Sequence, residues 1–210
     1  MGIKMGNPDL NVIIVAGDGD FLGMGAEHIG PQGMRNLDVT AVVMDNGVYG
    51  LTKGQSSPTT DLGVVTSSTP YGKMEEKLHP LRSYLTMGVS FIASTISTKV
   101  KDMTDIMYEA MNHSGFSIVH VQSPCTEYNN TFEALKGNVK KGIQPLAYDI
   151  PEGHDPSDAE AAQEIVNAEG IPLGIIYRDT SRPSFDKRVS DTTGIKDMKS
   201  VEGLLDGFTI

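Results

Sequence analysis

The sequence lacks the residues on which an exported, disulfide-stabilised protein depends. Its 210 residues include one cysteine, Cys125, and no tryptophan. A single cysteine cannot form a disulfide within the chain, so we expect a reducing, cytoplasmic setting. No stretch approaches the ~18 continuous apolar residues of a membrane-spanning helix, and the chain opens without the apolar core of a signal peptide. We therefore expect a soluble protein that is neither exported nor bound to a membrane.

Positive charge is also scarce. The chain has 17 Lys and Arg against 27 Asp and Glu, which gives a formal net charge of −10. Nucleic-acid binding relies on clustered Lys and Arg, so we expect no nucleic-acid partner. Hydrophobic residues make up 39% of the chain, which is slightly low for a compact domain. Either part of the chain is irregular, or a partner covers some of its surface.

Four short apolar runs, rich in β-branched residues, predict buried strands. They lack polar alternation, which is typical of a parallel sheet covered on both faces. Helical patterns lie between them, and strands alternating with helices predict a doubly wound, mostly parallel α/β fold. The predicted strands are Val12–Ala16, Val39–Met44, Val89–Ala93 and Ser117–Val121, and the predicted helices are Gly25–Asn36, His79–Met87 and Val100–Met111. Pro31 and Gly33 interrupt the first of these helices, which we expect to be kinked or shortened.

The rhythm of strands and helices ends near residue 125. We therefore divide the chain into an α/β domain at 1–125 and an irregular C-terminal arm at 126–210 that contacts a partner. Within this arm we expect a helix at Ser157–Glu169 capped by Ser157 or Asp155, a strand at Ile171–Tyr177 and a small helix near Lys196–Leu205.

Two aspartates follow the end of the first apolar strand, in the run VAGDGD. Asp18 lies between two glycines, and the next strand ends in Asp45-Asn46-Gly47. Parallel neighbours would bring Asp18 and Asn46 to the same edge of the sheet. Their oxygens suit Mg²⁺, which prefers one or two protein carboxylates together with phosphates and water. Each fragment alone is an ordinary turn signal, but the pair predicts a metal–phosphate site.

These residues carry a family resemblance. GDG followed by an asparagine, with Asp18 and Asn46 separated by 28 positions, resembles the motif of thiamine-diphosphate enzymes. The longer string DNGVYGLTKGQSSPTT resembles the thiamine-diphosphate-binding β subunit of 2-oxoacid:ferredoxin oxidoreductases, closest to the 2-oxoglutarate type. FIAST, HVQSPCTEYN and IPLGIIYRDTSRPSFD extend the likeness over nearly the whole chain. The resemblance implies that residues 1–125 form the thiamine-diphosphate-binding domain and lack the family's usual N-terminal segment, which is truncated, encoded separately or lost.

The resemblance also implies roles for individual residues. Mg²⁺ would be bound by the side chains of Asp18 and Asn46 and by the backbone carbonyl of Val48. Leu51 and Lys53 would act at the substrate, with Lys53 available to a substrate carboxylate. Residues 52–60 would form a loop that closes the site, and Lys101 would lie near it, although both lysines also fit ordinary surface charges. The remaining cofactor-binding positions are Gly17, Gly19 and Asp20 at the diphosphate, and Tyr49, Gly50 and Leu51 near the thiazolium ring.

Cys125 has two interpretations. A lone cysteine is most often a small buried hydrophobic residue. In the resembling family this position supplies one of the four thiolates that hold a [4Fe–4S] cluster. The other three would lie upstream, and this sequence contains none of them. A cluster held by Cys125 would therefore have to be completed by another chain.

The activity implied by the resemblance is oxidative decarboxylation of a 2-oxoacid with coenzyme A. It gives acyl-CoA, CO₂ and reduced ferredoxin. The glutamate that activates the cofactor comes from a partner subunit in resembling enzymes, and Glu27 and Glu127 are better explained as surface or structural residues. We therefore expect an α- or γ-type partner subunit, without which this chain is inactive. Two alternatives stay open: a thiamine-dependent non-oxidative decarboxylase or synthase subunit, and a truncated, inactive subunit.

Overall fold

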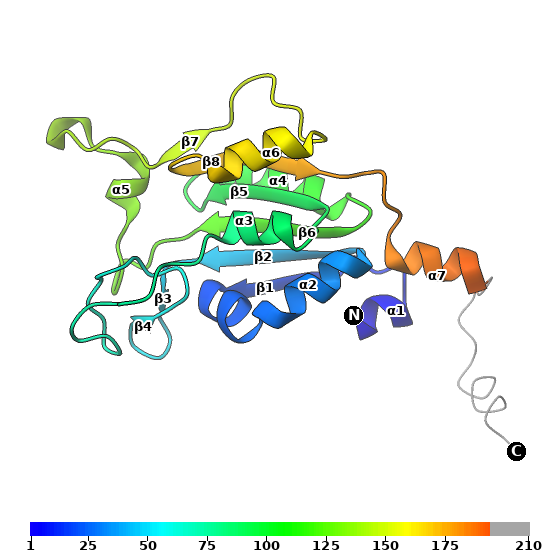
Figure 1. Ribbon diagram of the computed structural model, residues 1–210, viewed down its shortest axis with the longest axis horizontal. Coiled ribbons are helices and arrows are strands. Elements are labelled where there is room, and N and C mark those ends of the chain that lie inside the picture. The colour runs from blue at the N-terminus through cyan, green and yellow to red at the C-terminus, as the bar shows by residue number, and fades with distance from the viewer. Residues whose placement is uncertain (194–210) are drawn as a thin grey trace, which may run out of the picture.

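The computed structural model describes residues 1–193, and a six-stranded sheet forms its centre (Figure 1). The strands are β1 (Ile13–Gly17), β2 (Val39–Asp45), β5 (Phe91–Ile96), β6 (Phe116–Gln122), β7 (Ala147–Asp149) and β8 (Ile171–Arg178), and a separate ribbon pairs β3 (Val48–Tyr49) with β4 (Gln55–Ser56). The order in the sheet is β1-β2-β6-β5-β8-β7. The first four strands in this order run parallel, whereas β8 is antiparallel to β5. The doubly wound, mostly parallel α/β fold is confirmed.

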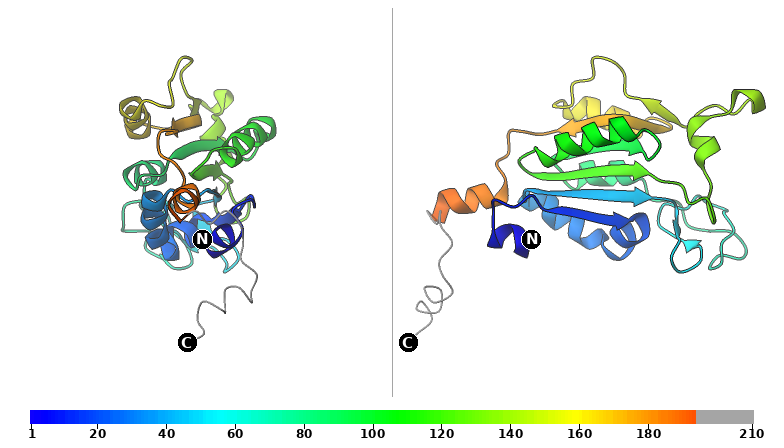
Figure 2. Two further views of the ribbon diagram at one scale, coloured as in Figure 1. Left: turned by 90° about the vertical axis from the view of Figure 1, so that its right-hand side faces the viewer. Right: turned by 180° about the vertical axis from the view of Figure 1, so that it is seen from behind.

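Helices cover both faces of this sheet. The helices are α1 (Gly2–Gly6), α2 (Ala26–Arg35), α3 (Pro80–Thr86), α4 (Val100–Met111), α5 (Phe132–Lys136), α6 (Ala159–Asn167) and α7 (Phe185–Thr193), with a π-helical turn at Gly19–Met24 and a 3₁₀ turn at Val139–Lys141. On one face, α2, α3 and α6 bury Ile29, Tyr84 and Val166 against the sheet. On the other, α4 buries Ile106 and Ala110 (Figure 2). None of the helices within residues 1–193 is long and apolar enough to cross a membrane.

The four parallel strands end at one edge of the sheet. Their last residues are Gly17, Asp45, Ile96 and Gln122. The register pairs Gly17 of β1 with Met44 of β2, so the two strands finish almost level. Loops leaving this edge are therefore brought together by the sheet, as is usual where open α/β folds bind ligands.

The elements predicted from apolar periodicity lie close to the observed ones, but the prediction that the first strand is buried is wrong. Strand β1 is at the edge of the sheet, and its side chains from Ile13 to Val15 are exposed. Helix α2 runs through Pro31 and covers nearly the whole predicted range, so the expected shortening is wrong. Gly33 has a packing role: a Cβ there would overlap the backbone carbonyl of Met87, just after α3. A glycine at this position lets the helix approach its neighbour more closely than any other residue would.

The C-terminal half is more closely joined to the sheet than its sequence indicates. The strand predicted at Ile171–Tyr177 is β8, which pairs with the central strand β5. Helix α6 begins after Asp158, whose carboxylate accepts hydrogen bonds from two backbone N–H groups of the first turn, so the prediction of Ser157 or Asp155 as the cap is wrong. The helix expected near Lys196–Leu205 lies outside the described residues.

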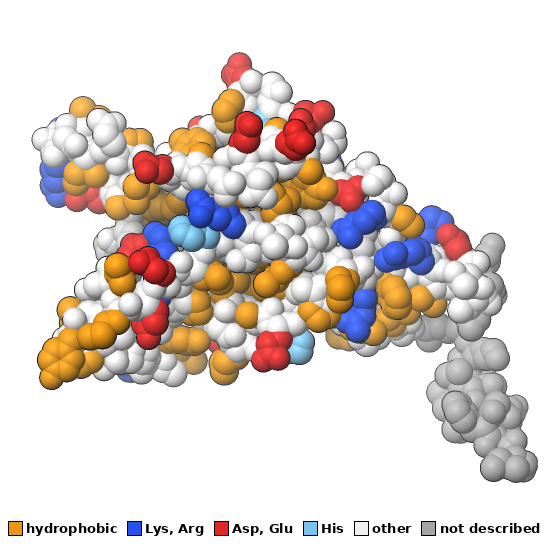
Figure 3. Space-filling view, in the orientation of Figure 1, with side chains coloured by type: hydrophobic (Ala, Val, Ile, Leu, Met, Phe, Trp, Pro, Cys, Tyr) orange, Lys and Arg blue, Asp and Glu red, His pale blue; other side chains and the backbone are white. Residues whose placement is uncertain are grey.

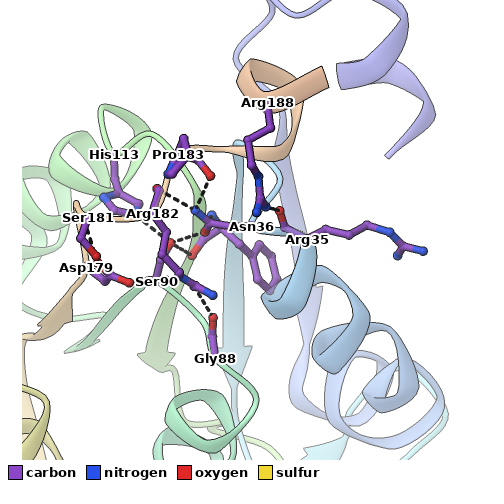
Figure 4. Close-up of polar contacts among 11 residues, drawn as sticks. Arg35, Asn36, Gly88, Ser90, His113, Asp179, Ser181, Arg182, Pro183 and Arg188 are labelled. Carbon is purple, nitrogen blue, oxygen red and sulfur yellow. Dashed lines mark hydrogen bonds and ion pairs between the residues drawn. The ribbon is translucent and has the colours of Figure 1, made fainter. Parts of the chain in front are cut away.

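Asn36 fastens the segment before α7 to the far edge of the sheet (Figure 4). This fully buried residue adopts a left-handed conformation, with φ of 56°, at the end of α2. Its side-chain oxygen accepts hydrogen bonds from the Ser90 hydroxyl at 2.6 Å and the Phe116 N–H at 3.0 Å. Its side-chain nitrogen donates to the Arg182 carbonyl at 3.2 Å. One residue thus links the end of α2, the residue before β5, the start of β6 and the C-terminal segment, at the edge opposite the carboxyl ends of the parallel strands.

Candidate functional site

Asp18 and Asn46 meet at the carboxyl edge of the sheet. Asp18 follows β1 and Asn46 follows β2, and the Asn46 backbone N–H donates to the Asp18 carboxylate across 3.3 Å. The Asp18 side chain is nearly inaccessible, with 1% of its surface exposed. No Lys, Arg or His within residues 1–193 forms an ion pair with it. The sheet therefore places the Asp18 carboxylate against the backbone of Asn46, and this buried carboxylate lacks a cationic partner in this part of the chain.

Val48 completes the predicted group of metal ligands. Its backbone N–H donates to the side-chain oxygen of Asn46 at 3.0 Å, which closes a tight turn between the two residues. Gly47 within this turn has φ of +68°, a conformation that favours glycine. The side-chain oxygen of Asn46 has two lone pairs, so accepting one hydrogen bond leaves it able to bind a cation. The local turn thus holds Asn46 and Val48 in fixed relation to Asp18.

A second carboxylate, that of Asp45, stands beside Asp18. The Thr59 hydroxyl lies 2.7 Å from the Asp18 carboxylate and 2.7 Å from the Asp45 carboxylate. A hydroxyl carries one hydrogen, so Thr59 can donate to only one of these acceptors at a time. Two acidic side chains therefore share a single donor, and the arrangement is one that a cation or an additional proton would stabilise.

The Asp45 carboxylate is hydrogen-bonded to His120 of β6. The Nε2 atom of His120 lies 2.9 Å from Asp45, and its Nδ1 atom lies 3.1 Å from the Tyr84 hydroxyl. Both His120 and Tyr84 are fully buried beneath the site. We did not predict Asp45, His120 or Thr59 individually from the sequence. The available signal was a histidine within the otherwise apolar run of β6.

The two carboxyl groups differ in acidity because their surroundings differ. Burial, reinforced by the negative charge of Asp45, raises the pKa of Asp18 above its ordinary value. Burial also acts to raise the pKa of Asp45, but its hydrogen bond to His120, the charge of His120 and the hydrogen bond from Thr59 outweigh it, so the pKa of Asp45 is lowered. Asp18 is therefore the carboxylate that gains more from a divalent cation.

Gly19 and Tyr49 pack directly against each other. The Tyr49 hydroxyl donates to the Gly19 carbonyl at 2.9 Å, and a Cβ at Gly19 would overlap the aromatic ring. Burial, followed by the charges of Asp20 and Asp18, raises the pKa of Tyr49. At Gly17, by contrast, an added Cβ would meet only the Asp20 carboxylate at 4.0 Å. The predicted diphosphate positions thus contain one glycine required by packing and one that faces free space.

The residues predicted to act at the substrate are more exposed. Leu51 has 96% of its surface exposed, and Lys53 is exposed with φ of +85°. Gly50 lies close to the Asn46 side chain, since a Cβ there would be 3.9 Å from the amide nitrogen. Lys101 lies in the first turn of α4, which follows the carboxyl end of β5. These residues follow the carboxyl ends of β2 and β5, and the side chains of Leu51, Lys53 and Lys101 are exposed there.

Cys125 follows β6 and faces the same loops. It forms an isolated bridge with Asn129, whose side chain donates to the Asn46 carbonyl at 2.9 Å. The half-buried Cys125 thiol is free. Within residues 1–193, no three His, Cys, Asp or Glu side chains gather as a metal site, so any cluster at Cys125 requires further ligands.

A cleft of about 410 Å³ opens next to the Asp45 carboxylate. It lies between the carboxyl edge of the sheet, the start of α3 and the turn from α6 to β8, and its wall includes Asp45, Asn46, Thr59 and His120. Charged side chains and a histidine surround a hollow on this face of the molecule (Figure 3). The residues present fit a divalent cation with an attached phosphate, because the buried Asp18 carboxylate, which has no cationic partner in the described chain, lies at the backbone of Asn46, and Asn46 borders the cleft.

Comparison with protein families agrees with this geometry. The model of the thiamine pyrophosphate enzyme C-terminal TPP binding domain matches residues 1–121. The model of the C-terminal region of the pyruvate ferredoxin oxidoreductase β subunit matches residues 128–193. The two matches together cover most of the described chain.

Individual proteins show the same likeness. The chain is 35% identical over 198 residues to a 2-oxoacid:ferredoxin oxidoreductase subunit beta of Saccharolobus solfataricus, a match that covers 91% of this chain and 65% of that protein. It is 39% identical over 124 residues to 2-oxoglutarate synthase subunit KorB of Archaeoglobus fulgidus, covering 59% of this chain and 46% of the relative. The chain thus spans less than two thirds of the length of these curated relatives.

The chain is also similar to a solved structure. It is a 2-oxoglutarate:ferredoxin oxidoreductase from Magnetococcus marinus with 2-oxoglutarate, coenzyme A and succinyl-CoA bound. The TM-score is 0.84 at 32% sequence identity, and the match covers 100% of this chain and 71% of the other.

Proposed function

The chain belongs to the family of 2-oxoacid:ferredoxin oxidoreductase β subunits, and on this basis we propose that it binds thiamine diphosphate and Mg²⁺ within such an enzyme. The complete enzyme oxidatively decarboxylates a 2-oxoacid with coenzyme A, giving acyl-CoA, CO₂ and reduced ferredoxin. The observation that carries this proposal is the hydrogen bond from the Asn46 backbone N–H to the Asp18 carboxylate, which joins the ends of two neighbouring strands at the predicted ligands.

Thiamine diphosphate, when bound, supplies the nucleophilic carbon and the electron sink that decarboxylation of a 2-oxoacid requires. The chain's own contribution is positioning. Asp18, Asn46 and the Val48 carbonyl would hold Mg²⁺, and Gly17, Gly19 and Asp20 would receive the diphosphate. Tyr49, Gly50 and Leu51 would lie against the thiazolium ring and the substrate. The buried position of Asp18 strengthens its attraction to the cation, because little water competes there.

We propose 2-oxoglutarate as the substrate. Lys53 would bind its distal carboxylate, with Leu51 beside the reacting carbon. Both residues are exposed on the loop that leaves the metal site, where a bound substrate or a partner subunit would cover them. Lys101, at the start of α4, is a further cation at this edge.

An α- or γ-type partner subunit would complete the active site. The segment around α5 projects from the body of the molecule (Figure 1), and Val139 on it is 98% exposed. We propose that this part of residues 126–210 contacts the partner, while residues 1–125 bind the cofactor. Cys125 would serve as one ligand of a [4Fe–4S] cluster whose other ligands come from outside the described chain.

The test is an assay of the complex of this chain with its partner subunit. With 2-oxoglutarate, coenzyme A, thiamine diphosphate and Mg²⁺, we expect CO₂ release coupled to ferredoxin reduction and succinyl-CoA formation. Iron analysis of the same complex would test the cluster. CO₂ release without ferredoxin reduction would instead indicate a non-oxidative decarboxylase or synthase. Absence of thiamine-diphosphate binding by the complex would indicate an inactive subunit.

A further inference from the structure

Lys73 is a buried lysine outside every motif identified in the sequence. Its side chain is 6% exposed, and its ammonium group donates to three backbone carbonyls of one turn. The distances are 3.1 Å to Ser57, 3.3 Å to Pro58 and 2.8 Å to Thr60. Within residues 1–193, no carboxylate forms an ion pair with it.

This contact set is complete. An ammonium group has three N–H donors, and here each can be assigned to one carbonyl. Burial of a charged group is costly unless it is well hydrogen-bonded, so the three carbonyls are what allows Lys73 to stay inside. The backbone of Lys73 is fixed as well, because it pairs with Gly63 and Val64. Lys73 therefore holds the backbone of the turn at 57–60 in place through these three hydrogen bonds.

The turn supported by Lys73 carries the hydroxyl that lies between the two carboxylates. Thr59 points to Asp18 and Asp45, whereas Thr60 donates to the carbonyl of Gly47. The same four-residue turn thus touches Lys73 on one side and the metal-binding edge on the other. Displacement of its carbonyls would displace the hydroxyl of Thr59.

We propose that Lys73 is a positioning residue that sets the affinity of the site for Mg²⁺ and a diphosphate. It acts by holding Thr59 between the carboxylates of Asp18 and Asp45. This inference rests on the proposed function, because it concerns the same ligands. When Thr59 is released, the two buried carboxylates lose their shared donor, and Asp18 loses one of the hydrogen bonds that orient it.

The test is a double-mutant cycle of Lys73→Met and Thr59→Val in the complex with the partner subunit. Calorimetry would give the dissociation constant of Mg²⁺ in the presence of saturating thiamine diphosphate. We expect each single variant to weaken Mg²⁺ binding about tenfold and the double variant to weaken it no further, because the two residues act through one arrangement. Thr59→Ser, which keeps the hydroxyl, should restore most of the affinity.

The matched control is Lys4→Met. Lys4 is also buried, with 3% exposed, but it pairs with Asp38 and donates to Leu10 at the opposite edge of the sheet. We expect this variant to lower the melting temperature without changing Mg²⁺ affinity. A loss of affinity in Lys4→Met equal to that in Lys73→Met would overturn the inference, since it would show that general destabilisation explains the effect.

Two further results would overturn it. Unchanged Mg²⁺ affinity in Lys73→Met, or effects of the two substitutions that add fully, would show that Lys73 does not act through Thr59. Should Lys73→Met fail to fold, Lys73→Arg replaces it, because a planar guanidinium cannot reproduce the three-carbonyl contact. Failure of the wild-type complex to bind thiamine diphosphate would overturn the proposed function together with this inference, whereas normal wild-type binding with an unaffected Lys73→Met removes this inference alone.

Discussion

The imidazole of His120 and the carboxylate of Asp45 lie 2.9 Å apart in the interior, although 75 positions separate them in the sequence. An ionised carboxylate can only accept a hydrogen bond, so the Nε2 atom of His120 carries the hydrogen between them. On its other side, His120 reaches the Tyr84 hydroxyl. This buried series of hydrogen bonds from Tyr84 through His120 supports Asp45, which lies beside Asp18 at the strand ends. Its loss should be measurable.

Replacement of His120 by phenylalanine should destabilise the fold. It would leave the Asp45 carboxylate and the Tyr84 hydroxyl buried without their partner, and each unsatisfied group costs about 1–3 kcal/mol. We expect urea denaturation to show a loss of about 2–6 kcal/mol in the free energy of unfolding. Tyr84→Phe, which removes one hydroxyl and leaves the Asp45 contact in place, should cost about 1 kcal/mol. Equal losses in the two variants would show that the contact with Asp45 adds nothing.

Asp18→Asn should separate stability from binding. Asn has the same shape: its oxygen can accept the Asn46 hydrogen bond, and its NH2 group can donate to the Thr59 hydroxyl, which stays free to donate to Asp45. It lacks the desolvated charge that Asp45 repels. We expect the ligand-free variant to gain about 1 kcal/mol in unfolding free energy, as is common when a strained binding residue is replaced. It should also lose the stabilisation by thiamine diphosphate and Mg²⁺, about 2.7 kcal/mol at 100 times the dissociation constant.

The control for this variant is Asp105→Asn on the exposed surface of α4. It removes the same charge far from any described partner of Asp18. It should change neither the unfolding free energy of the ligand-free protein nor the stabilisation by thiamine diphosphate and Mg²⁺. Thermal melts with and without both ligands would measure the effect. A melting shift in Asp18→Asn as large as that of the wild type would contradict the role given to Asp18.

The raised pKa of Asp18 predicts how the free energy of unfolding changes with pH. Burial first, and the charge of Asp45 second, raise its folded-state pKa above the ordinary value of 3.8. As the pH rises through this range, the unfolded chain releases its proton before the folded protein does, so the free energy of unfolding falls. The stability advantage of Asp18→Asn over the wild type should therefore grow with pH and level off above the raised pKa. Urea denaturation between pH 3 and pH 8 would test this, and an advantage that shrinks with pH would contradict it.

The two glycines of the GDG run should respond differently to alanine. At Gly19 a Cβ would overlap the Tyr49 ring, so Gly19→Ala should lower the unfolding free energy by about 1–3 kcal/mol. At Gly17 the added Cβ meets no atom closer than 4.0 Å, so the ligand-free protein should keep its stability. Because that space is assigned to the diphosphate, Gly17→Ala should weaken thiamine-diphosphate binding. Wild-type affinity in a stable Gly17→Ala protein would show that the diphosphate lies elsewhere.

Much of this fold can be predicted from short stretches of sequence. The strands β2 and β6 are runs of buried apolar residues, and their pattern does not depend on distant contacts. Asp18 and Asn46 could be paired in advance because each directly follows a predicted strand, and parallel neighbours must end at one edge. The local apolar pattern predicts the strands, and one general rule of sheet topology then predicts that their ends lie together.

The remainder depends on contacts between distant segments. Lys73 lies in a stretch that resembles any polar loop, and only the folded turn supplies its three carbonyls. His120 gains its role from a strand and a helix that are remote in sequence. The helix cap at Asp158 was missed because Asp155 and Ser157 are equally good capping types, and the geometry of the preceding turn decides among them.

The central claim is that Asp18, Asn46 and Val48 bind a divalent ion that tethers a diphosphate. The most direct measurement is ³¹P NMR of thiamine diphosphate added to the complex with its partner subunit, with paramagnetic Mn²⁺ in place of Mg²⁺, since both ions accept oxygen ligands. We predict strong broadening of the diphosphate signals by the wild-type complex and none beyond that of free Mn²⁺ in the Asp18→Asn complex. Equal broadening in both, or none in either, would contradict the site described above.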